Sequence, residues 1–146
     1  MKSKKITSLD NKKLKNLIKL SKKSKFRNET NLFIIEGEKE VNASISGNYK
    51  IRSLFYDPTI IELKKIKIPI ETEIIEVSNI IYKKISFRGS SEGIIAIAEK
   101  KNYSSKNIKI DNKKVVLILD GIEKPGNIGA ILRTSQASNV DTIVIT

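Results

Sequence analysis

The sequence predicts an α/β fold, in which strands and helices alternate along the chain around a mainly parallel or mixed sheet. Short apolar runs rich in β-branched residues alternate with helical segments over residues 32–100. A polar stretch poor in packing groups follows at 101–113, and the alternation resumes at 114. We therefore expect a small α/β sandwich domain over residues 1–100, a linker at 101–113, and the beginning of a second α/β domain at 114–146.

The first predicted element is a basic helix over residues 9–24. Leu14, Leu17 and Ile18 recur at helical spacing on one face, and lysines cover the rest of the helix. Its candidate N-caps are Ser8 and Asp10. The apolar stripe is narrow, so we expect this helix to pack as a satellite on another element.

The sequence pattern predicts strands that alternate with short helices in the rest of the first domain. We expect strands at 32–37, 51–57, 73–77 and 94–100, and helices at 38–47, 58–67 and 79–85. Asp57 followed by Pro58 is a favourable helix start, and Ser78 is a candidate cap for the helix at 79–85. In the second part, we expect strands at 114–120 and 141–146 and a helix at 127–138 between them. A single βαβ unit of this kind does not bury both faces of its strands, so we expect the second domain to be incomplete.

The composition excludes several kinds of chemistry. The 146 residues include no Cys and no His, which excludes disulfides, thiolate or histidine metal ligands, a cysteine nucleophile and a histidine-based triad. We expect no metal site. No apolar run approaches the roughly 18 residues that a membrane span needs, and the N-terminus lacks the apolar core of a signal peptide. We therefore expect a soluble cytoplasmic protein with no membrane partner.

The positive charge is concentrated at the N-terminus. Residues 1–27 contain 10 Lys and one Arg against one Asp, whereas residues 28–146 are nearly neutral. A basic block of this kind indicates a polyanion such as nucleic acid as partner. The chain also has 24 Lys against four Arg and is rich in Ile and Asn, as a genome with AT-rich codons would produce. A merely solvated basic helix is therefore the alternative interpretation.

The segment LDGIEKPGNIGAILRT, residues 119–134, contains the chemically most informative pattern. It lies between a strand and a helix, where open α/β sheets bind ligands. Pro125, Gly126 and Gly129 suit a tight loop whose backbone approaches a ligand, and Asn127 is a candidate helix cap. The spacing matches neither a P-loop nor a dinucleotide-binding fingerprint. An ordinary βα turn and a surface arginine at Arg133 remain the alternative interpretation.

The same stretch, DGIEKPGNIGAILRTSQASNVDTIVI, resembles the first signature motif of the SpoU (TrmH-like) branch of the SPOUT RNA methyltransferases. The match includes Asp120, Pro125, Asn127, Gly129, Arg133 and Thr134. Three N-terminal stretches, ITSLDNKKLK, KKSKFRNETNLFIIEGEKEV and SSEGIIAIAE, resemble the RNA-binding domain of the same family in the same order. The resemblance therefore extends over nearly the whole chain.

This resemblance implies transfer of a methyl group from S-adenosylmethionine to a ribose 2′-hydroxyl of RNA, most often ribosomal RNA. It places Asn127 and Arg133 at the family's catalytic positions. Arg is effectively always protonated, so orientation of the ribose and its phosphate is a safer role for Arg133 than proton abstraction. Gly126 and Gly129 would keep the loop close to the substrate.

The resemblance also implies that these 146 residues lack part of the family's methyltransferase domain. The family's second and third motifs form a trefoil knot that holds the cofactor, and the sequence contains neither. We therefore expect a truncated SPOUT (knotted Rossmann-like) domain without its knot, no cofactor-binding residues, and no activity from these 146 residues alone. Full-length members are homodimers, whereas the oligomeric state here stays open.

Candidate RNA contacts come from the basic block and from the Gly/Ser loop at 86–93. The candidates are Lys12, Lys13, Lys15, Lys19, Lys22, Lys23, Lys25, Arg27 and Arg88. Tyr82, Phe87 and Tyr103 have rings that can stack on unpaired bases, although packing in the core or linker is the simpler expectation. A non-catalytic RNA-binding module resembling ribosomal α/β proteins is the alternative function. The failed phosphate motifs disfavour a nucleotide-binding domain.

Overall fold

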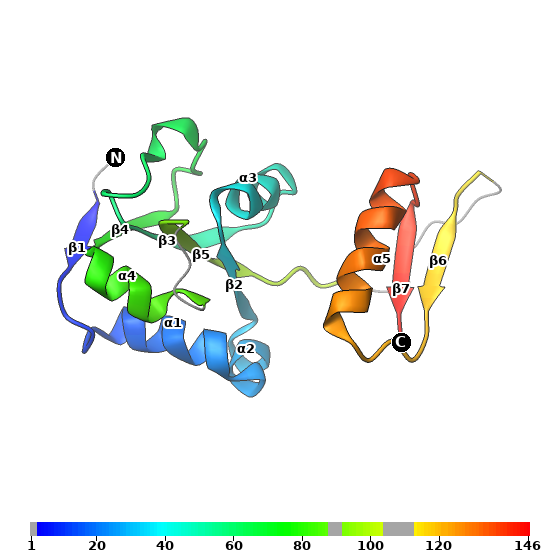
Figure 1. The fold of residues 1–146 in the computed structure, drawn as a ribbon, viewed down its shortest axis with the longest axis horizontal. Coiled ribbons are helices and arrows are strands. Elements are labelled where there is room, and N and C mark those ends of the chain that lie inside the picture. Colours follow the sequence, from blue (N-terminus) through cyan, green and yellow to red (C-terminus); the bar gives the residue numbers. More distant parts are fainter. Residues whose placement is uncertain (1–2, 88–91, 104–112) are drawn as a thin grey trace. The chain divides into compact units, whose positions relative to one another are not determined.

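The computed structural model describes residues 3–87, 92–103 and 113–146 (Figure 1). The chain divides between Lys101 and Asn102 into two compact units, called unit 1 and unit 2 below. Both have α/β architecture, which confirms the predicted fold class.

Unit 1 is built on a mixed five-stranded sheet in the order β1-β4-β3-β5-β2. Its strands are β1 (Lys4–Ile6), β2 (Leu32–Glu36), β3 (Ile51–Tyr56), β4 (Glu73–Val77) and β5 (Ile94–Glu99). Strand β4 is parallel to β1 and β3, whereas β5 is antiparallel to β2 and β3. The sequence did not predict β1, because a strand of three residues with one buried apolar side chain has no detectable alternation.

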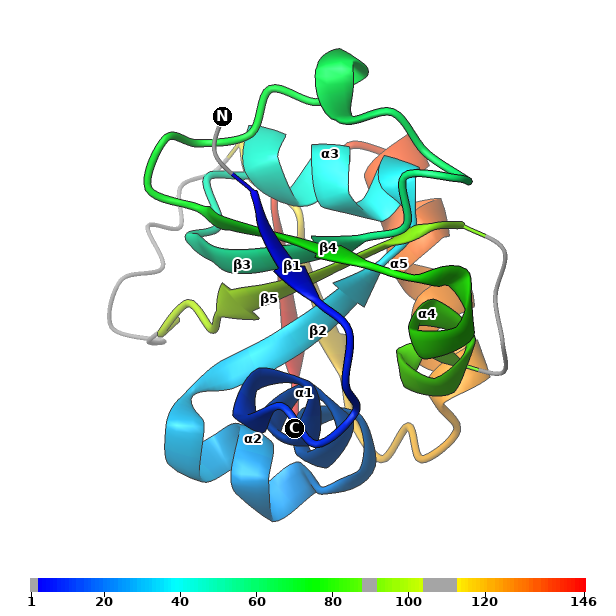
Figure 2. The ribbon, with the colours of Figure 1, turned by 90° about the vertical axis from the view of Figure 1, so that its left-hand side faces the viewer.

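Helices α1 (Lys12–Lys22), α2 (Ser24–Thr30) and α4 (Asn79–Ile85) lie on one face of this sheet (Figure 2). Leu14, Leu17 and Leu20 of α1 are at most 1% exposed and pack with strand residues such as Phe55 and Ile75. The expectation that this helix is a peripheral satellite was therefore wrong. Its start was also placed too early, because Asn11 is the N-cap and accepts a hydrogen bond from the Lys13 N–H.

Helix α3 (Glu38–Ser46) covers the opposite face, together with the segment around the 3₁₀ turn η1 (Leu63–Lys65) (Figure 2). Val41 of α3 packs there against Ile35 and Leu54, and Gly47 ends the helix as predicted. The helix predicted at 58–67 does not form. That segment is a turn followed by η1, and it buries Ile61 and Ile66 against the sheet.

The buried carboxylate of Asp57 explains why the chain turns at this point. Its Oδ1 accepts hydrogen bonds from the Thr59 N–H at 3.0 Å and the Thr59 hydroxyl at 2.7 Å. Its Oδ2 accepts from the side-chain amide of Asn79 at 2.8 Å. Asp57 therefore closes an Asx turn and joins the end of β3 to the first turn of α4, instead of capping a helix.

Unit 2 is a βαβ element. Strands β6 (Val116–Leu119) and β7 (Thr142–Ile145) pair in parallel, and α5 (Pro125–Ala137) connects them (Figure 1). Asn139 follows the helix with a φ of 53°, the left-handed conformation that Asn tolerates better than most residues. In the described part of unit 2, only Leu119 and Ser135 are buried, so this element has little core of its own.

We predict that Asp57→Ala lowers the free energy of unfolding by about 2–4 kcal/mol, because Thr59 and Asn79 lose a buried acceptor. Burial by itself would raise the pKa of Asp57. The hydrogen bonds from Thr59 and Asn79 and the charge of Lys83 outweigh burial, so the pKa lies below its ordinary value of 3.8. The ionised carboxylate is thus a stabilising group above about pH 4, and its contribution disappears as the pH falls through the lowered pKa.

Urea unfolding between pH 2 and pH 7 measures this effect. The difference between the native chain and Asp57→Asn should be constant near neutral pH and shrink below about pH 4. A difference that persists unchanged at the acid end would contradict the stabilising role of the ionised form.

Candidate nucleic-acid interface and helix-start loop

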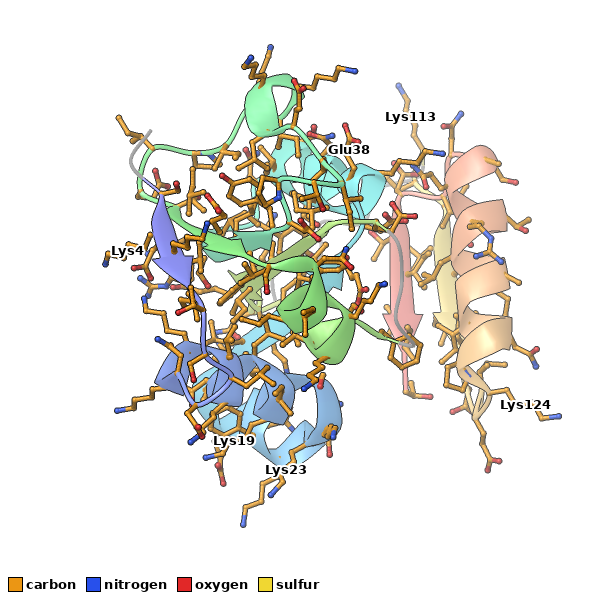
Figure 3. All side chains as sticks on the ribbon, turned by 60° about the vertical axis from the view of Figure 1, so that its left-hand side comes forward. Lys4, Lys19, Lys23, Glu38, Lys113 and Lys124 are labelled. Atoms are coloured by element: carbon orange, nitrogen blue, oxygen red, sulfur yellow. The ribbon has the colours of Figure 1, made fainter. Side chains whose placement is uncertain are left out.

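Four lysines of α1 form a continuous basic stripe, Lys12, Lys15, Lys19 and Lys22. Their spacing of three, four and three residues places them on one side of the helix, over a length of about 15 Å. All four are exposed, since the leucines of α1 occupy the side that faces the sheet. Figure 3 shows Lys19, with Lys23 just beyond the helix end, directed outward. We call this set the α1 stripe.

Acidic neighbours neutralise part of the basic block. Glu73 of β4 pairs with Lys4 at 2.8 Å and also with Lys13, and these two hydrogen bonds hold the pKa of Glu73 below its ordinary value. Lys13 therefore ties α1 to the sheet and is less suited to a phosphate than the sequence suggested. Lys15 pairs with Asp10 at 2.9 Å, but both side chains are more than half exposed, so this pair is weak.

The other predicted basic contacts differ in their surroundings. Lys19 lies 5.8 Å from the centre of the Phe26 ring, and Lys25 pairs with Glu29 at 3.9 Å. Lys23 is exposed where α1 ends and α2 begins. Arg88 lies outside the described residues.

Arg27 has a structural role that the sequence did not indicate. Its guanidinium donates hydrogen bonds to the carbonyl oxygens of Leu20, at 2.8 Å, and Ser21, at 3.4 Å. These carbonyls belong to the last turn of α1, where backbone acceptors have no partner within the helix. Arg27 therefore caps α1 from α2, and its Nη1 donates to the protein backbone.

The three aromatic residues predicted as stacking candidates are not equivalent. Tyr82 is fully buried in the core of unit 1, so packing is its role. Phe87 and Tyr103 are 68% and 80% exposed. The backbone N–H of Phe87 donates to both carboxylate oxygens of Glu36, at 2.9 Å and 3.2 Å. This contact fixes the chain at Phe87 against the end of β2.

The helix-start loop of unit 2 differs in detail from the prediction. Helix α5 begins at Pro125, two residues earlier than expected, with Pro at its first position. Lys124 is the N-cap residue and makes no side-chain cap bond. Asn127 is therefore not the cap. It lies in the first turn, where its backbone N–H donates to the Lys124 carbonyl and its side chain is exposed.

Arg133 lies on the exposed surface of α5 and extends back towards the helix start. Its Nη1 is 3.9 Å from the position that a Cβ on Gly129 would occupy. This geometry follows from the tilt of helical side chains towards the N-terminus. The guanidinium of Arg133 thus lies about one helical turn nearer to Asn127 than the backbone of Arg133 does. Gly129 has no side chain and leaves room for the guanidinium.

The described residues do not enclose a cofactor at this loop. A Cβ added to Gly121 or Gly126 would meet nothing within 4 Å, so no wall faces the loop backbone. A hollow of 340 Å³ in the described part of unit 2 lies between α5 and β6. Its lining includes Leu117, Ile131 and Ser135 but no residue of the loop. These residues alone do not fit S-adenosylmethionine.

Neither a metal centre nor a membrane span is found among the described residues. They contain no group of three or more metal-ligating side chains placed to hold an ion. None of their helices is long and apolar enough to cross a membrane.

Comparison with known families identifies the domain type of unit 1. Residues 11–96 match the MRM3-like substrate binding domain. The matched range contains α1 to α4 and most of the five-stranded sheet, and it excludes unit 2.

Relatives extend the similarity into unit 2. The 23S rRNA (guanosine(2553)-2'-O)-methyltransferase RlmP of Bacillus subtilis is 28% identical over 97% of this chain and 54% of its own length. The AdoMet-bound rRNA methyltransferase from Sinorhizobium meliloti superposes with a TM-score of 0.83 at 28% identity, covering 98% of this chain and 54% of that one. An RNA 2'-O ribose methyltransferase gives a TM-score of 0.76 at 26% identity, covering 97% and 55%. This chain therefore spans about half the length of these three proteins.

We predict that Arg27→Gln destabilises unit 1 by about 1–2 kcal/mol, because the last carbonyls of α1 lose a charged donor. The matched control is Lys12→Gln, which also removes one positive charge, from an exposed position. It should change the free energy of unfolding by less than about 0.5 kcal/mol. Urea unfolding followed by circular dichroism measures both, and equal stability of the two variants would refute the capping role.

Proposed function

Because the chain belongs to the MRM3-like substrate binding domain family, we propose that residues 1–100 bind RNA for a SpoU (TrmH-like) ribosomal RNA 2′-O-methyltransferase. Residues 114–146 would then begin the methyltransferase domain, after a linker at 101–113. The superposition of 98% of the chain on an AdoMet-bound rRNA methyltransferase is the observation that carries this proposal. The proposed setting is the cytoplasm, and the proposed assembly of the whole enzyme is a homodimer.

The proposed RNA surface of unit 1 is the α1 stripe. Lysines bind phosphates regardless of the RNA sequence. The stripe would therefore position the RNA without recognising particular bases. Within the described residues, neither Lys12 nor Lys22 forms an ion pair with an acidic side chain. These two lysines can therefore contact phosphates without first breaking an ion pair.

The proposed role of α5 is to hold the ribose that receives the methyl group. The methyl donor in this proposal is S-adenosylmethionine, which supplies an activated methyl group when bound. Arg133 donates hydrogen bonds and carries a fixed positive charge, so it would orient the 2′-hydroxyl and the neighbouring phosphate. Asn127 offers both a donor and an acceptor in the first turn of the same helix. The exposure of both side chains is consistent with an RNA substrate that approaches from solvent.

We predict that RNA binding depends on the α1 stripe. In the triple variant Lys12→Gln, Lys15→Gln and Lys19→Gln, the dependence of log affinity on log salt should flatten by roughly 0.7–0.9 for each phosphate that the variant no longer binds. The matched control neutralises Lys64, Lys65 and Lys67, which are exposed around η1 and belong to the segment on the other side of the sheet.

Fluorescence anisotropy with a labelled fragment of ribosomal RNA, titrated at several salt concentrations, measures these slopes. The control should keep the native slope. If the control and the stripe variant flatten equally, the RNA has no preference for the α1 face and the assigned surface is wrong.

We also predict that a polypeptide of these 146 residues neither binds S-adenosylmethionine at micromolar concentration nor methylates RNA. The loop around Gly126 lacks enclosing walls, whereas small-molecule sites bury most of their ligand. The reaction also requires the donor and the 2′-oxygen to be held at near-contact distance. Calorimetry with the cofactor and a tritiated-methyl assay on ribosomal RNA test this, and micromolar cofactor binding would show that the site lies elsewhere.

A further inference from the structure

We propose that a groove at the end of the α1 stripe binds an unpaired nucleotide of the RNA, with the Phe87 ring as the surface on which its base stacks. This inference rests on the proposed function, because it assumes that unit 1 binds RNA. It adds a site that distinguishes unpaired from paired RNA, which the α1 stripe by itself cannot do.

The groove has a volume of 850 Å³ and is formed by five elements of unit 1, one of which is α2, through Arg27. The C-terminal half of α1, strand β2, the start of α3 and the end of α4 with the residues that follow all contribute to its lining. Apolar side chains from α1 and β2, including Ile18, Phe33 and Ile34, form part of its surface. Small-ligand sites have volumes of about 300–1,000 Å³, so the groove is large enough for one nucleotide.

Phe87 is placed to act as a stacking surface. Its side chain lines the groove and is 68% exposed, so a base that enters the groove can reach the ring. The Glu36 carboxylate accepts from its backbone N–H, so the residue is anchored by its main chain. The side chain is therefore not required for that contact, and it can be replaced without removing the anchor.

Charge favours RNA as the occupant. Lys22 belongs both to the α1 stripe and to the groove lining, so phosphates bound along the stripe would lead a strand to the groove. Lys84 lines the groove from α4. A continuous basic path into a partly apolar groove with an exposed ring is the combination that binds single-stranded nucleic acid.

The groove lining itself is not strongly positive. Glu36, Glu40 and Glu92 line it, and Nη1 of Arg27 donates to carbonyls of α1. Carboxylates repel a phosphate, but they accept hydrogen bonds from the N–H groups on a base edge. The structure therefore favours insertion of the base into the groove and retention of the backbone on the α1 stripe.

The experiment compares two RNAs of equal length and charge, a hairpin with an unpaired loop and a fully paired duplex. Affinities are measured by fluorescence anisotropy for the full chain and for Phe87→Ala, Phe87→Trp and Ile80→Ala. Ile80 is a matched control, because it is 71% exposed on α4 and does not line the groove. Circular dichroism verifies that each variant is folded.

The native chain should bind the hairpin more tightly than the duplex. Phe87→Ala should weaken hairpin binding by roughly tenfold and leave duplex binding unchanged, because the base no longer stacks on an aromatic ring. Phe87→Trp should retain the native preference, since it retains a ring, and Ile80→Ala should behave as the native chain.

Native affinities of Phe87→Ala for both RNAs would overturn the groove site but leave the proposed function intact. Equal weakening for hairpin and duplex would also overturn it, because the groove would then not select unpaired bases. Absence of salt-dependent binding of either RNA by the native chain would overturn the proposed function and this inference together.

Discussion

Strand β5 is buried on both faces, and the rest of unit 1 is arranged to cover it. Ile95 and Ile97 point into the core beneath α1 and α4, whereas Ile94, Ala96 and Ala98 point into the core beneath α3. A strand with apolar side chains on both faces is stable only between two layers. The helices on either side and the neighbouring strands β2 and β3 follow from this requirement.

This requirement also determines which charges face solvent. Helix α1 must direct its leucines to the sheet, so its lysines are left on the outer side as a stripe. The same packing brings Glu73 to Lys13 and the carbonyls of α1 to Arg27. The basic block at residues 1–27 has a formal charge of +10. Only some of its lysines are exposed without an acidic partner, and the fold determines which of them can contact a polyanion.

Unit 2 shows how little a single βαβ element can enclose. The parallel strands bring Asp120 and Thr146 together at their carboxyl ends, where the Thr146 hydroxyl donates to the Asp120 carboxylate. Asn127 and Arg133 lie on the adjoining helix with exposed side chains. A pocket for a small molecule needs walls from several elements, and in the described residues the loop is open. The motif residues follow a strand end and lie along a helix that leaves most of them exposed.

The sequence by itself determined the α/β class, most strands, and helices α3, α4 and α5, because hydrophobic periodicity, Gly47 and the Ser78 cap are local signals. It also determined the SpoU-type motif around Asn127 and Arg133. Only the tertiary structure decided that Asp57 joins the end of β3 to α4, because its partner Asn79 is distant in the sequence. The same holds for Lys13, Arg27 and the groove beside Phe87, whose roles depend on contacts between elements. Local sequence patterns specify which helices and strands form. The role of each polar side chain depends on which residues of other elements lie next to it once the sheet and helices are packed.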